Sequence, residues 1–376
     1  MRTYGIFGLV LLLLCACRGG SGGTALSVQA DTLDLRHAEH LKIVTHPGYT
    51  VATLRNPWDT TRVLNTYILV GKDSPLPDSL PAGTLVRVPL QRMVVYSSVH
   101  NSLFYRLGAL KHIAGICGLH YVNLEPIVNE CKEGRIVDLG DGMNPDVERL
   151  VELNPDAIFL SPFENSGGYG RVGKLGVPII ECADYMETSA LGRAEWMRFY
   201  GLLLGKTEVA DSLFRAVEQR YDSLRSLVAE VAKKPTVMCD LKTSATWYTP
   251  GGSSTMGRLL ADAGAHYVFA HTSNSGSIPY PFEVVFDRGR EADFWLVRYN
   301  QARDKTYGEL ASDFSAYTGF RPYAERRIYG CNTGHVPFYE EVPFGPDALL
   351  KDLIKIFHPD LLPEHRLQYY TPLLED

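Results

Sequence analysis

A glycine-rich run after an apolar segment is the most suggestive local pattern in the chain. Gly168-Tyr169-Gly170-Arg171-Val172-Gly173 has the glycine spacing of nucleotide-binding loops. Such a loop must open a helix of about a dozen residues, whereas Pro178 and the next strand-like run come only four to five residues after Gly173. The pattern therefore predicts a tight backbone turn beside a ligand and not a nucleotide site.

Signatures of other catalytic and metal sites are missing from the sequence. There is no GxxxxGK[ST], HExxH or CxxC pattern, no GxSxG nucleophile turn outside the glycine-rich tether at 19–23, and no metal-ligand spacing among the 11 His. Asp138, Asp141 and Asp240 could transfer protons, but no motif gives any of them a partner. We therefore expect neither catalysis nor a bound cofactor or structural metal.

The composition is that of a folded protein of about two domains. The 376 residues include 37 Lys plus Arg and 43 Asp plus Glu, which gives a formal charge of −6. Non-specific nucleic-acid binding normally needs a basic surplus, so that class is excluded. At 45% hydrophobic residues the chain can bury a core in each domain.

The first residues predict export and attachment to a membrane. Arg2 precedes an apolar run at 6–14, which is too short to span a bilayer because a span needs about 20 residues. Leu14 stands three places before Cys17, which resembles the lipobox of bacterial lipoproteins. Cleavage before Cys17 would leave its thiol at the new N-terminus to carry lipid, followed by a flexible glycine-rich tether. An ordinary secretory signal with incidental cysteines is the alternative.

Export makes the later cysteines candidates for disulfides. Cys117 and Cys131 enclose a short loop-like stretch and are the expected pair. Cys182 and Cys239 lie in apolar strand-like runs, where buried free thiols are expected. With Cys331 the number is odd, so at least one thiol stays free.

Apolar periodicity divides the next part of the chain into a β-rich segment and an α/β lobe. Strand-like residues fill 41–53, 62–71 and 84–90, which we expect to form a small sheet. From residue 93 strands and helices alternate, which is typical of a lobe with a parallel sheet. The predicted elements are strand 93–96, helix 101–107, strand 136–139, helix 145–153, strand 157–160, and strand 177–181 with a further short strand in the apolar turn before it.

A long amphipathic helix is predicted in the middle of the chain. Apolar residues recur at spacings of three and four from Ala210 to Val231, Thr207 can cap the start, and Lys233-Lys234-Pro235 ends the pattern. A helix over 207–234 would extend about 42 Å, enough to brace two lobes. A shorter helix at 191–204 precedes it.

The alternation then resumes as a second lobe. The predicted strands are 236–240, 266–270, 294–299 and 327–331, and the predicted helices are 254–263, 282–290, 307–317 and 346–357. The expected fold class is therefore α/β, with two Rossmann-like lobes joined by a long α-helix, a ligand cleft between the lobes and an extra N-terminal β-rich segment.

Glu148 and Glu283 occupy equivalent places in the two lobes. Each lies on a helix that is followed by an aspartate and a buried strand, with Asp156 in one lobe and Asp293 in the other. A glutamate on an amphipathic helix most often simply faces solvent. The pattern alone leaves open whether the two glutamates have a further role.

Several passages together carry a family resemblance from about residue 92 to residue 359. They are Val94-Val95-Tyr96-Ser97-Ser98, Val137-Asp138-Leu139-Gly140, Asn144-Pro145-Asp146-Val147-Glu148-Arg149-Leu150, Asn154-Pro155-Asp156-Ala157-Ile158 and Pro281-Phe282-Glu283-Val284, together with the long helix. With them the chain resembles the helix-backbone class (class III) of bacterial ABC-importer substrate-binding proteins, the group that handles ferric siderophores, haem and cobalamin. It looks closest to lipoproteins of Bacteroidetes-like bacteria, through residues 165–171 and 181–185.

The resemblance implies roles for particular residues. The family contacts arginines of the two permease subunits through one glutamate on each lobe, and Glu148 and Glu283 match those positions. Ligand contacts are expected in loops after strands, where aromatic rings can stack on a macrocycle or catecholate and a guanidinium can pair with a carboxylate. The candidates are Ser97, Ser98, His100, Phe163, Tyr169, Arg171, Trp247 and Tyr248. A histidine or tyrosine could also ligate haem iron, and part of this set could simply pack the loops.

The resemblance implies a carrier that performs no chemistry. It would capture an iron chelate (a ferric siderophore or haem) or cobalamin and deliver it to an ABC permease dimer. We expect a monomer in the cell envelope that faces the periplasm, touches the membrane only through its N-terminal lipid, and moves its lobes little because the long helix braces both. The alternatives are a secreted enzyme acting on a cofactor precursor or glycan, and a metal-ion or chelatase-like protein of similar lobe design.

The expected segments follow from these assignments. They are a signal peptide at 1–16, a tether at 17–23, a β-rich segment at 24–90, a first α/β lobe at 91–190, connecting helices at 191–234 and a second α/β lobe at 235–376. Residues 26–89 lie outside the resemblance and receive no role from it.

Overall fold

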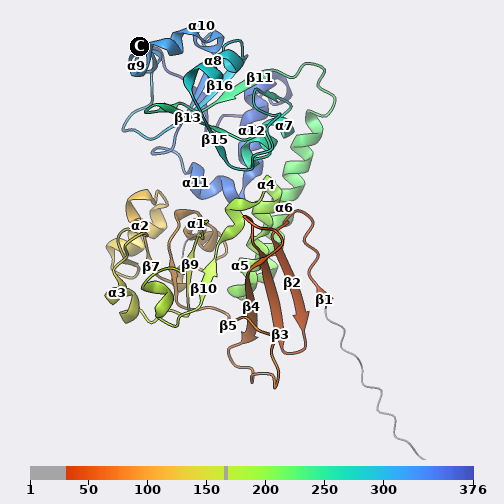
Figure 1. The fold of residues 1–376 in the computed structure, drawn as a ribbon, viewed down its shortest axis with the longest axis vertical. Coiled ribbons are helices and arrows are strands. Elements are labelled where there is room, and N and C mark those ends of the chain that lie inside the picture. The colour runs from red at the N-terminus through yellow and green to blue at the C-terminus, as the bar shows by residue number, and fades with distance from the viewer. Residues whose placement is uncertain (1–30, 165–167) are drawn as a thin grey trace, which may run out of the picture.

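The computed structural model describes residues 31–164 and 168–376, drawn in Figure 1. The predicted signal peptide, the tether and the lipid-bearing Cys17 lie outside the described residues. Among the residues that are described, no helix is both long enough and apolar enough to cross a membrane.

The N-terminal segment forms a five-stranded sheet beside the first lobe (Figure 1). Its strands are β1 (Asp31–Thr32), β2 (Leu41–His46), β3 (Tyr49–Arg55), β4 (Val63–Gly71) and β5 (Thr84–Val88). The β-rich stretch expected at 41–53 contains two antiparallel strands, because the chain turns at Gly48 with a φ of +85°. Tyr67 of β4 is buried, and its hydroxyl donates a hydrogen bond to the carbonyl of Ile179 in the first lobe at 3.0 Å.

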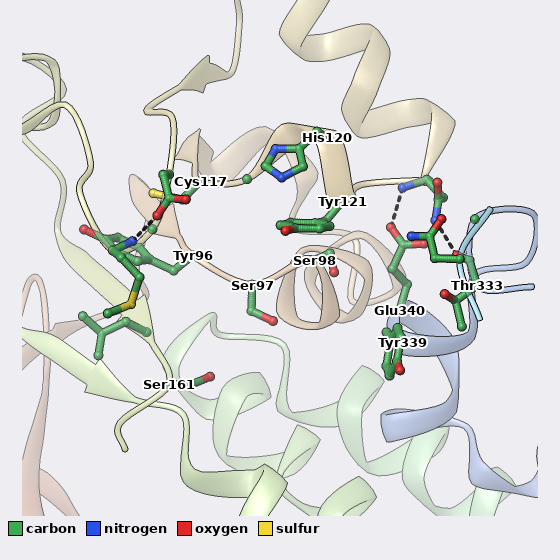
Figure 2. Close-up of a pocket in the computed structure, with 18 of the residues that line it drawn as sticks. Tyr96, Ser97, Ser98, Cys117, His120, Tyr121, Ser161, Thr333, Tyr339 and Glu340 are labelled. Atoms are coloured by element: carbon green, nitrogen blue, oxygen red, sulfur yellow. Dashed lines mark hydrogen bonds between the residues drawn. The ribbon is translucent and has the colours of Figure 1, made fainter. Parts of the chain in front are cut away.

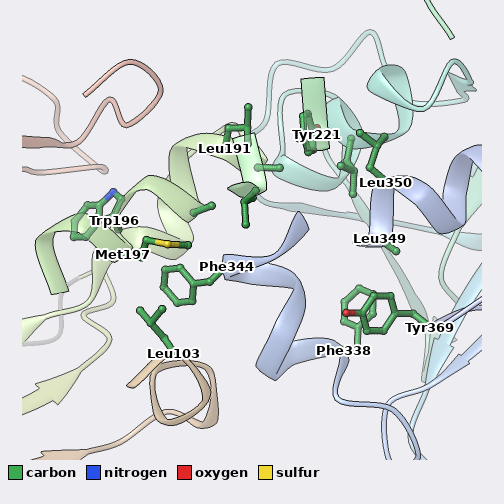
Figure 3. Close-up of a cluster of buried hydrophobic side chains, with 14 of the residues drawn as sticks. Leu103, Leu191, Trp196, Met197, Tyr221, Phe338, Phe344, Leu349, Leu350 and Tyr369 are labelled. Atoms are coloured by element: carbon green, nitrogen blue, oxygen red, sulfur yellow. The ribbon is translucent and has the colours of Figure 1, made fainter. Parts of the chain in front are cut away.

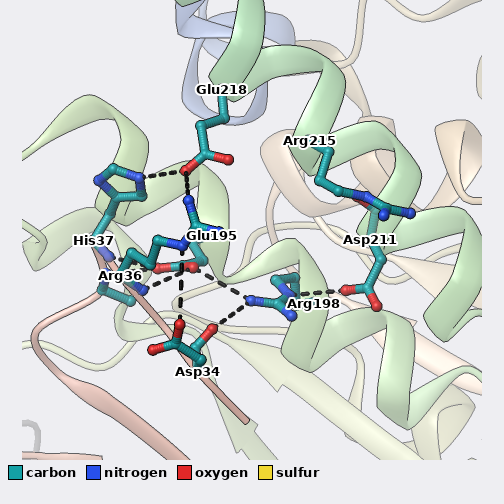
Figure 4. A network of polar contacts seen from close by, with 9 residues as sticks. Asp34, Arg36, His37, Glu195, Arg198, Asp211, Arg215 and Glu218 are labelled. Atoms are coloured by element: carbon teal, nitrogen blue, oxygen red, sulfur yellow. Dashed lines mark hydrogen bonds and ion pairs between the residues drawn. The ribbon is translucent and has the colours of Figure 1, made fainter. Parts of the chain in front are cut away.

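Two buried carboxylates fix the start of this sheet to the helices that connect the lobes. Glu195 accepts hydrogen bonds from three successive backbone N–H groups, those of residues 36–38, at 3.1, 2.8 and 2.9 Å. Glu187 accepts two more, from residues 39 and 40, both at 2.9 Å. Figure 4 shows the cluster around Glu195, where Arg198 also pairs with Asp211 at 2.8 Å. Because bonds to a charged acceptor are strong, the extra sheet is a fixed part of the molecule.

The first lobe is a parallel sheet in the order β10-β9-β6-β7-β8. Its strands are β6 (Met93–Val95), β7 (Ile113–Ile116), β8 (Val137–Asp138), β9 (Ala157–Leu160) and β10 (Ile179–Glu181), and its helices are α1 (Ser98–Arg106), α2 (Glu125–Lys132) and α3 (Val147–Glu152). The sequence patterns did not predict β7 or α2. The apolar turn before β10 is a single 3-10 turn, Val172–Lys174, and not the short strand that we expected.

Three helices follow in the middle of the chain, α4 (Ala190–Glu195), α5 (Met197–Leu203) and α6 (Thr207–Leu227). The long helix, α6, has 21 residues, about 32 Å, and is shorter than the predicted 207–234. Residues 228–230 form a turn, and beyond the buried Val228 most side chains up to residue 234 are exposed. Further helical turns would have little apolar face to bury, so the helix ends early.

The second lobe is a sheet in the order β14-β11-β16-β17-β18, parallel except for β18. The strands are β11 (Thr236–Cys239), β14 (His266–Tyr267), β16 (Phe294–Tyr299), β17 (Ile328–Asn332) and β18 (Thr371–Pro372), and the main helices are α7 (Thr255–Asp262), α8 (Phe282–Gly289), α9 (Tyr307–Asp313), α10 (Arg321–Ala324), α11 (Phe338–Glu341) and α12 (Pro346–Phe357). A separate antiparallel sheet, which the sequence did not predict, contains β12 (Lys242–Thr243), β13 (Thr246–Pro250) and β15 (Ser277–Tyr280).

One apolar core continues from the first lobe into the second. Phe344, which follows α11, is fully buried, and its ring centroid lies 5.9 Å from that of His100 and 6.0 Å from that of Tyr200. Figure 3 shows Phe344 reaching towards Leu103 of α1 and Met197 of α5. Because helices α5 and α12 both pack on α6, the two lobes are joined through a packed layer of helices. The fold class predicted from the sequence is confirmed.

Candidate ligand cleft

A cavity of about 1000 Å³ lies between the two lobes. The first lobe lines it with the residues that follow β6, β7, β8 and β9, and the second lobe with those that follow β16 and β17 and with α11. Figure 2 shows Tyr96, Cys117 and Ser161 at one end of this space and Thr333, Tyr339 and Glu340 at the other. Loops at the carboxyl ends of parallel strands are where open α/β sheets bind ligands.

Four large apolar side chains of this cavity are left open to solvent. The exposed fractions are 66% for Tyr121, 81% for Met143, 50% for Phe163 and 53% for Tyr339. The ring of His120 lies against that of Tyr121, with 3.9 Å between their centroids. Exposed apolar side chains inside a concave site are typical of ligand binding, so the cavity favours a cargo with flat apolar faces.

Glu340 of α11 is the one acidic side chain that the cavity buries almost completely. Only 3% of it is exposed, and its Oε1 accepts a hydrogen bond at 2.7 Å from the backbone N–H of Asn123 in the first lobe. Its Oε2 is buried without a hydrogen-bond partner among the described residues. Burial raises the pKa of Glu340, although the N–H groups of Asn123 and Leu124 act in the opposite direction. A buried acceptor without a partner is costly unless a ligand supplies one.

Arg298 is the only lysine or arginine among the described residues that line the cavity. It forms a two-point ion pair with Asp240, with Nε 2.9 Å from Oδ1 and Nη2 2.8 Å from Oδ2. Burial disfavours a charged guanidinium, but Asp240 outweighs that effect and raises the pKa of Arg298. The arginine is therefore charged, and its charge is already balanced by a carboxylate.

Small polar groups cover the wall at the end of β6. Ser97 and Ser98 line the cavity, and Ser97 also caps α1, because its Oγ accepts a hydrogen bond from the N–H of Val99 at 3.3 Å. The hydroxyl of Tyr96 is buried without a partner in the described part of the chain, and burial raises its pKa. Tyr96 is thus a neutral hydroxyl that can donate to a ligand.

The glycine-rich loop behaves as its sequence indicated. Gly168, Tyr169 and Gly170 all have positive φ, and a single 3-10 turn follows in place of a helix. Tyr169 lines the cavity, and its hydroxyl donates a hydrogen bond to Glu181. The loop therefore turns tightly beside the cavity, and it lacks the helix that a dinucleotide site requires.

The structure brings four of the eight predicted ligand residues to the cavity. They are Ser97, Ser98, Phe163 and Tyr169. His100 is not among them, because it is only 2% exposed and its Nε2 lies 2.8 Å from Oδ1 of the buried Asp184. Burial alone would lower the pKa of His100, but Cys182 and Asp184 outweigh it and raise that pKa to about 10. His100 is thus part of the core and not of the ligand surface.

The other three predicted ligand residues also lie away from the cavity lining. Trp247 is fully buried, stacks on Trp295 with 5.8 Å between ring centroids, and donates its indole N–H to the carbonyl of Cys239 at 3.0 Å. Tyr248 is 51% exposed on the small antiparallel sheet, where alternate side chains point to opposite faces. Arg171 is exposed outside the cavity lining.

The predicted disulfide is wrong, because Cys117 and Cys131 are both free thiols in the structure. Cys117 packs in the cluster that covers one face of the first-lobe sheet, whereas Cys131 packs against the main core that includes the other face. The two thiols therefore belong to different layers. Burial raises the pKa of Cys117 to about 12 and that of Cys131 to about 11. The predictions of buried free thiols at Cys182 and Cys239 are confirmed.

Sequence reasoning missed much of the cavity. His120 and Tyr121 follow β7, a strand that the analysis did not predict. Arg298 lies near the end of the predicted strand 294–299, so its position carried a usable signal. No pattern pointed to Tyr339 or Glu340, which a short helix from the second lobe carries to the cleft.

No cluster of three or more His, Cys, Asp or Glu side chains within residues 31–164 and 168–376 could hold a metal ion. Of the carboxylates considered for acid–base chemistry, Asp141 lines the cavity, while Asp240 is paired with Arg298. Asp138 accepts a hydrogen bond from the backbone N–H of Gly140 at 3.0 Å.

Glu148 and Glu283 both lie in the first turn of an exposed helix end, on α3 and α8 respectively. Both side chains are exposed, and neither makes a hydrogen bond or ion pair with the described residues. Each lobe thus carries a free carboxylate in the first turn of a surface helix, where a partner that contacts both lobes could reach it.

Comparisons with known proteins agree with this architecture. A periplasmic binding protein family matches residues 93–333, more than half of the chain. A relative from Methanocaldococcus jannaschii, named Uncharacterized lipoprotein MJ0878, is 24% identical over 319 residues, which are 81% of this chain and 75% of the relative.

Two solved structures have a similar fold. A possible iron-binding periplasmic solute-binding protein from Staphylococcus epidermidis has a TM-score of 0.56 and 19% identity, covering 72% of this chain and 99% of that one. A periplasmic haem-binding protein from Pseudomonas aeruginosa has a TM-score of 0.55 and 14% identity, covering 76% and 96%. With the family match over both lobes, the two-lobed fold and the cleft, the chain belongs to the periplasmic binding protein family, the solute-binding components of ABC transport.

Proposed function

We propose that this protein captures an iron chelate (a ferric siderophore or haem) or cobalamin in the cleft and delivers it to an ABC permease without changing it. The observation that carries the proposal is the cavity of about 1000 Å³ with four exposed large apolar side chains. A site of this size suits a macrocycle or a metal chelate, and the rings of Tyr121, Phe163 and Tyr339 can stack on its flat faces.

The same proposal includes the position of the protein in the cell. A lipid on Cys17 would hold the monomer to the envelope membrane, with the two lobes facing the periplasm. The predicted lipobox and the lipoprotein name of the M. jannaschii relative support this part. Labelling of cells with an alkyne fatty acid should mark the wild-type protein and leave the Cys17→Ala variant unmarked.

Calorimetric titration tests the carrier function. The whole protein, reconstituted in lipid nanodiscs, is titrated with ferric siderophores, haemin and cyanocobalamin, and empty nanodiscs serve as the control. We expect saturable one-to-one binding by one of these compounds, which mass spectrometry then recovers unchanged. Calorimetry is preferable to tryptophan fluorescence, because none of the four tryptophans lines the cavity. Turnover of a bound compound would instead favour a secreted enzyme.

A further inference from the structure

The charges of the cleft restrict what it can bind. Its described lining contains two acidic side chains, Asp141 and Glu340, and one arginine. That arginine, Arg298, is bound at two points by Asp240, so its positive charge is already balanced by a carboxylate of the protein. The uncompensated charge of the cleft is therefore negative.

The two carboxylate oxygens of Glu340 have different surroundings. Its Oε1 is held by the N–H of Asn123 from the opposite lobe, while Oε2 is buried within the lining and has no partner among the described residues. A carboxylate oxygen in this position can accept a hydrogen bond from a donor of the cargo, such as an amide N–H, a hydroxyl or an ammonium group. A carboxylate of the cargo in the same place would face Glu340 without a cation to separate them.

The remaining lining fits the same kind of cargo. Hydroxyl groups of Tyr96, Ser97 and Ser98 can bond to neutral polar groups, and the exposed rings supply apolar contact. Arg171, the cation that the sequence suggested for pairing with an anionic cargo, is exposed outside the lining. Polar recognition here depends on neutral and acidic groups.

We infer that the cargo is a neutral or cationic chelate whose rim carries N–H or O–H donors, and that Glu340 selects it by accepting a hydrogen bond at Oε2. This inference rests on the proposed function and narrows it. Among the compounds named above it favours amide-rimmed corrinoids and cationic or neutral hydroxamate chelates. It disfavours catecholate siderophores and haem, which present anionic groups.

A charge-graded panel tests the inference with the whole protein in nanodiscs. The probes are cyanocobalamin (neutral), ferrioxamine B (cationic), haemin (two carboxylates) and ferric enterobactin (trianionic). We expect one of the first two to bind at least about tenfold more tightly than either anionic probe. If haemin or ferric enterobactin binds most tightly, the charge inference is overturned while the carrier function stands. If no probe in the panel binds, the proposed function itself fails, and the inference fails with it.

Variants identify the residue responsible. Glu340→Gln keeps the size of the side chain. It should lower the affinity for the preferred cargo by about tenfold or more, because a hydrogen bond to a charged acceptor is lost. Glu341→Gln is the matched control, since Glu341 bonds to Gln368 and Tyr369 outside the cavity and should leave affinity unchanged. Equal effects of the two variants on affinity would overturn the role of Glu340.

A second variant keeps the test valid if Glu340→Gln does not fold. Asp141 is exposed, and its Oδ1 accepts a single hydrogen bond, from the backbone N–H of Met143 at 2.7 Å, so Asp141→Lys should lower the thermal unfolding midpoint only slightly. The variant should bind a cationic probe several-fold more weakly than the wild type and should bind haemin more tightly, because it reverses a charge in the lining. Unchanged affinities for both probes would show that the charge of the cleft does not select the cargo.

Discussion

His100 Nε2 lies 2.8 Å from Asp184 Oδ1, and both side chains are almost completely buried. Asp184 also accepts hydrogen bonds from Tyr200 at 2.8 Å and Arg193 at 3.1 Å. Burial alone would raise the pKa of Asp184, but His100 and Arg193 lower it to about 2. This cluster joins α1 of the first lobe to the connecting helices, next to Phe344 from the second lobe.

Removing one member of this pair should destabilise the fold. We expect His100→Asn to lower the free energy of unfolding by about 3 kcal/mol, because it removes one of the two cationic partners of the buried Asp184 and leaves only Arg193. Urea unfolding followed by circular dichroism gives the value, and the exposed His266→Asn provides the control. A loss below about 0.5 kcal/mol would show that the pair contributes little to stability.

The same pair makes stability depend on pH. The pKa of His100 is raised from 6.5 to about 10, so its contribution is complete below pH 6.5 and disappears as the pH rises through 10. The pKa of Asp184 is lowered from 3.8 to about 2, so its contribution is present above pH 3.8 and disappears as the pH falls towards 2. Between pH 6.5 and 10 the wild type should lose more unfolding free energy than His100→Asn. Parallel curves for the two proteins would contradict this assignment.

Substitutions at two phenylalanines should affect stability and cargo binding separately. Phe344→Ala should cost about 3 to 5 kcal/mol of unfolding free energy, because it empties a buried position between the lobes. Phe163→Ala should change stability little, because half of the side chain is exposed, yet it should weaken cargo binding several-fold through lost ring contact. Chemical unfolding and calorimetry on both variants check the two effects. The reverse pattern would place the cargo away from the described cleft.

Cysteine labelling tests whether Cys117 and Cys131 are free thiols. Without reductant, denatured protein treated with iodoacetamide should carry label on both Cys117 and Cys131, because each is a free thiol. In the folded protein both should react slowly, since burial raises the pKa of each thiol and the thiolate is the reactive form. Peptide mapping that finds the two cysteines linked would overturn the free-thiol assignment.

The sequence predicted the lobes better than the cleft, and particular residues explain why. Helix α12 and strands β9 and β16 have the predicted bounds, because their apolar patterns are long or fully buried. The predicted long helix was longer than the observed one. Amphipathic spacing continues to Val231 in the sequence, although most side chains after Val228 are exposed. Trp247 looked like a stacking residue, but its neighbours in the fold are Trp295, Tyr317 and Phe320. Sequence spacing does not reveal which aromatic rings pack against each other.

Residues from distant parts of the chain meet in the cleft, and such long-range contacts cannot be predicted from a single sequence. Glu340 and Asn123 are 217 positions apart, yet they bond across the lobes at 2.7 Å. Neither belongs to a motif, and Glu340 is carried by a four-residue helix. Ser97, in contrast, directly follows a predicted strand, and it lines the cavity as that position suggests.

Glu148 and Glu283 lead to the last prediction, which concerns the permease. We expect the double change Glu148→Lys and Glu283→Lys to lower cargo uptake by cells about tenfold or more, because it reverses the two exposed charges that would orient the lobes on the permease. Cargo affinity measured by calorimetry should not change, since neither residue lines the cavity. Uptake of radiolabelled cargo, at equal protein levels, is the measurement.

Each of the two helices offers its own control. Glu152 on α3 and Asp287 on α8 are also exposed acids, so Glu152→Lys with Asp287→Lys makes the same change in net charge on the same elements. If position matters, this control should transport nearly as well as wild type. If both double variants lose uptake equally, the permease responds to overall charge, and Glu148 and Glu283 are ordinary solvent-facing residues. Restored uptake on changing facing permease arginines to glutamate would identify direct pairing, because a reversed charge pair recovers its attraction only when the two groups meet.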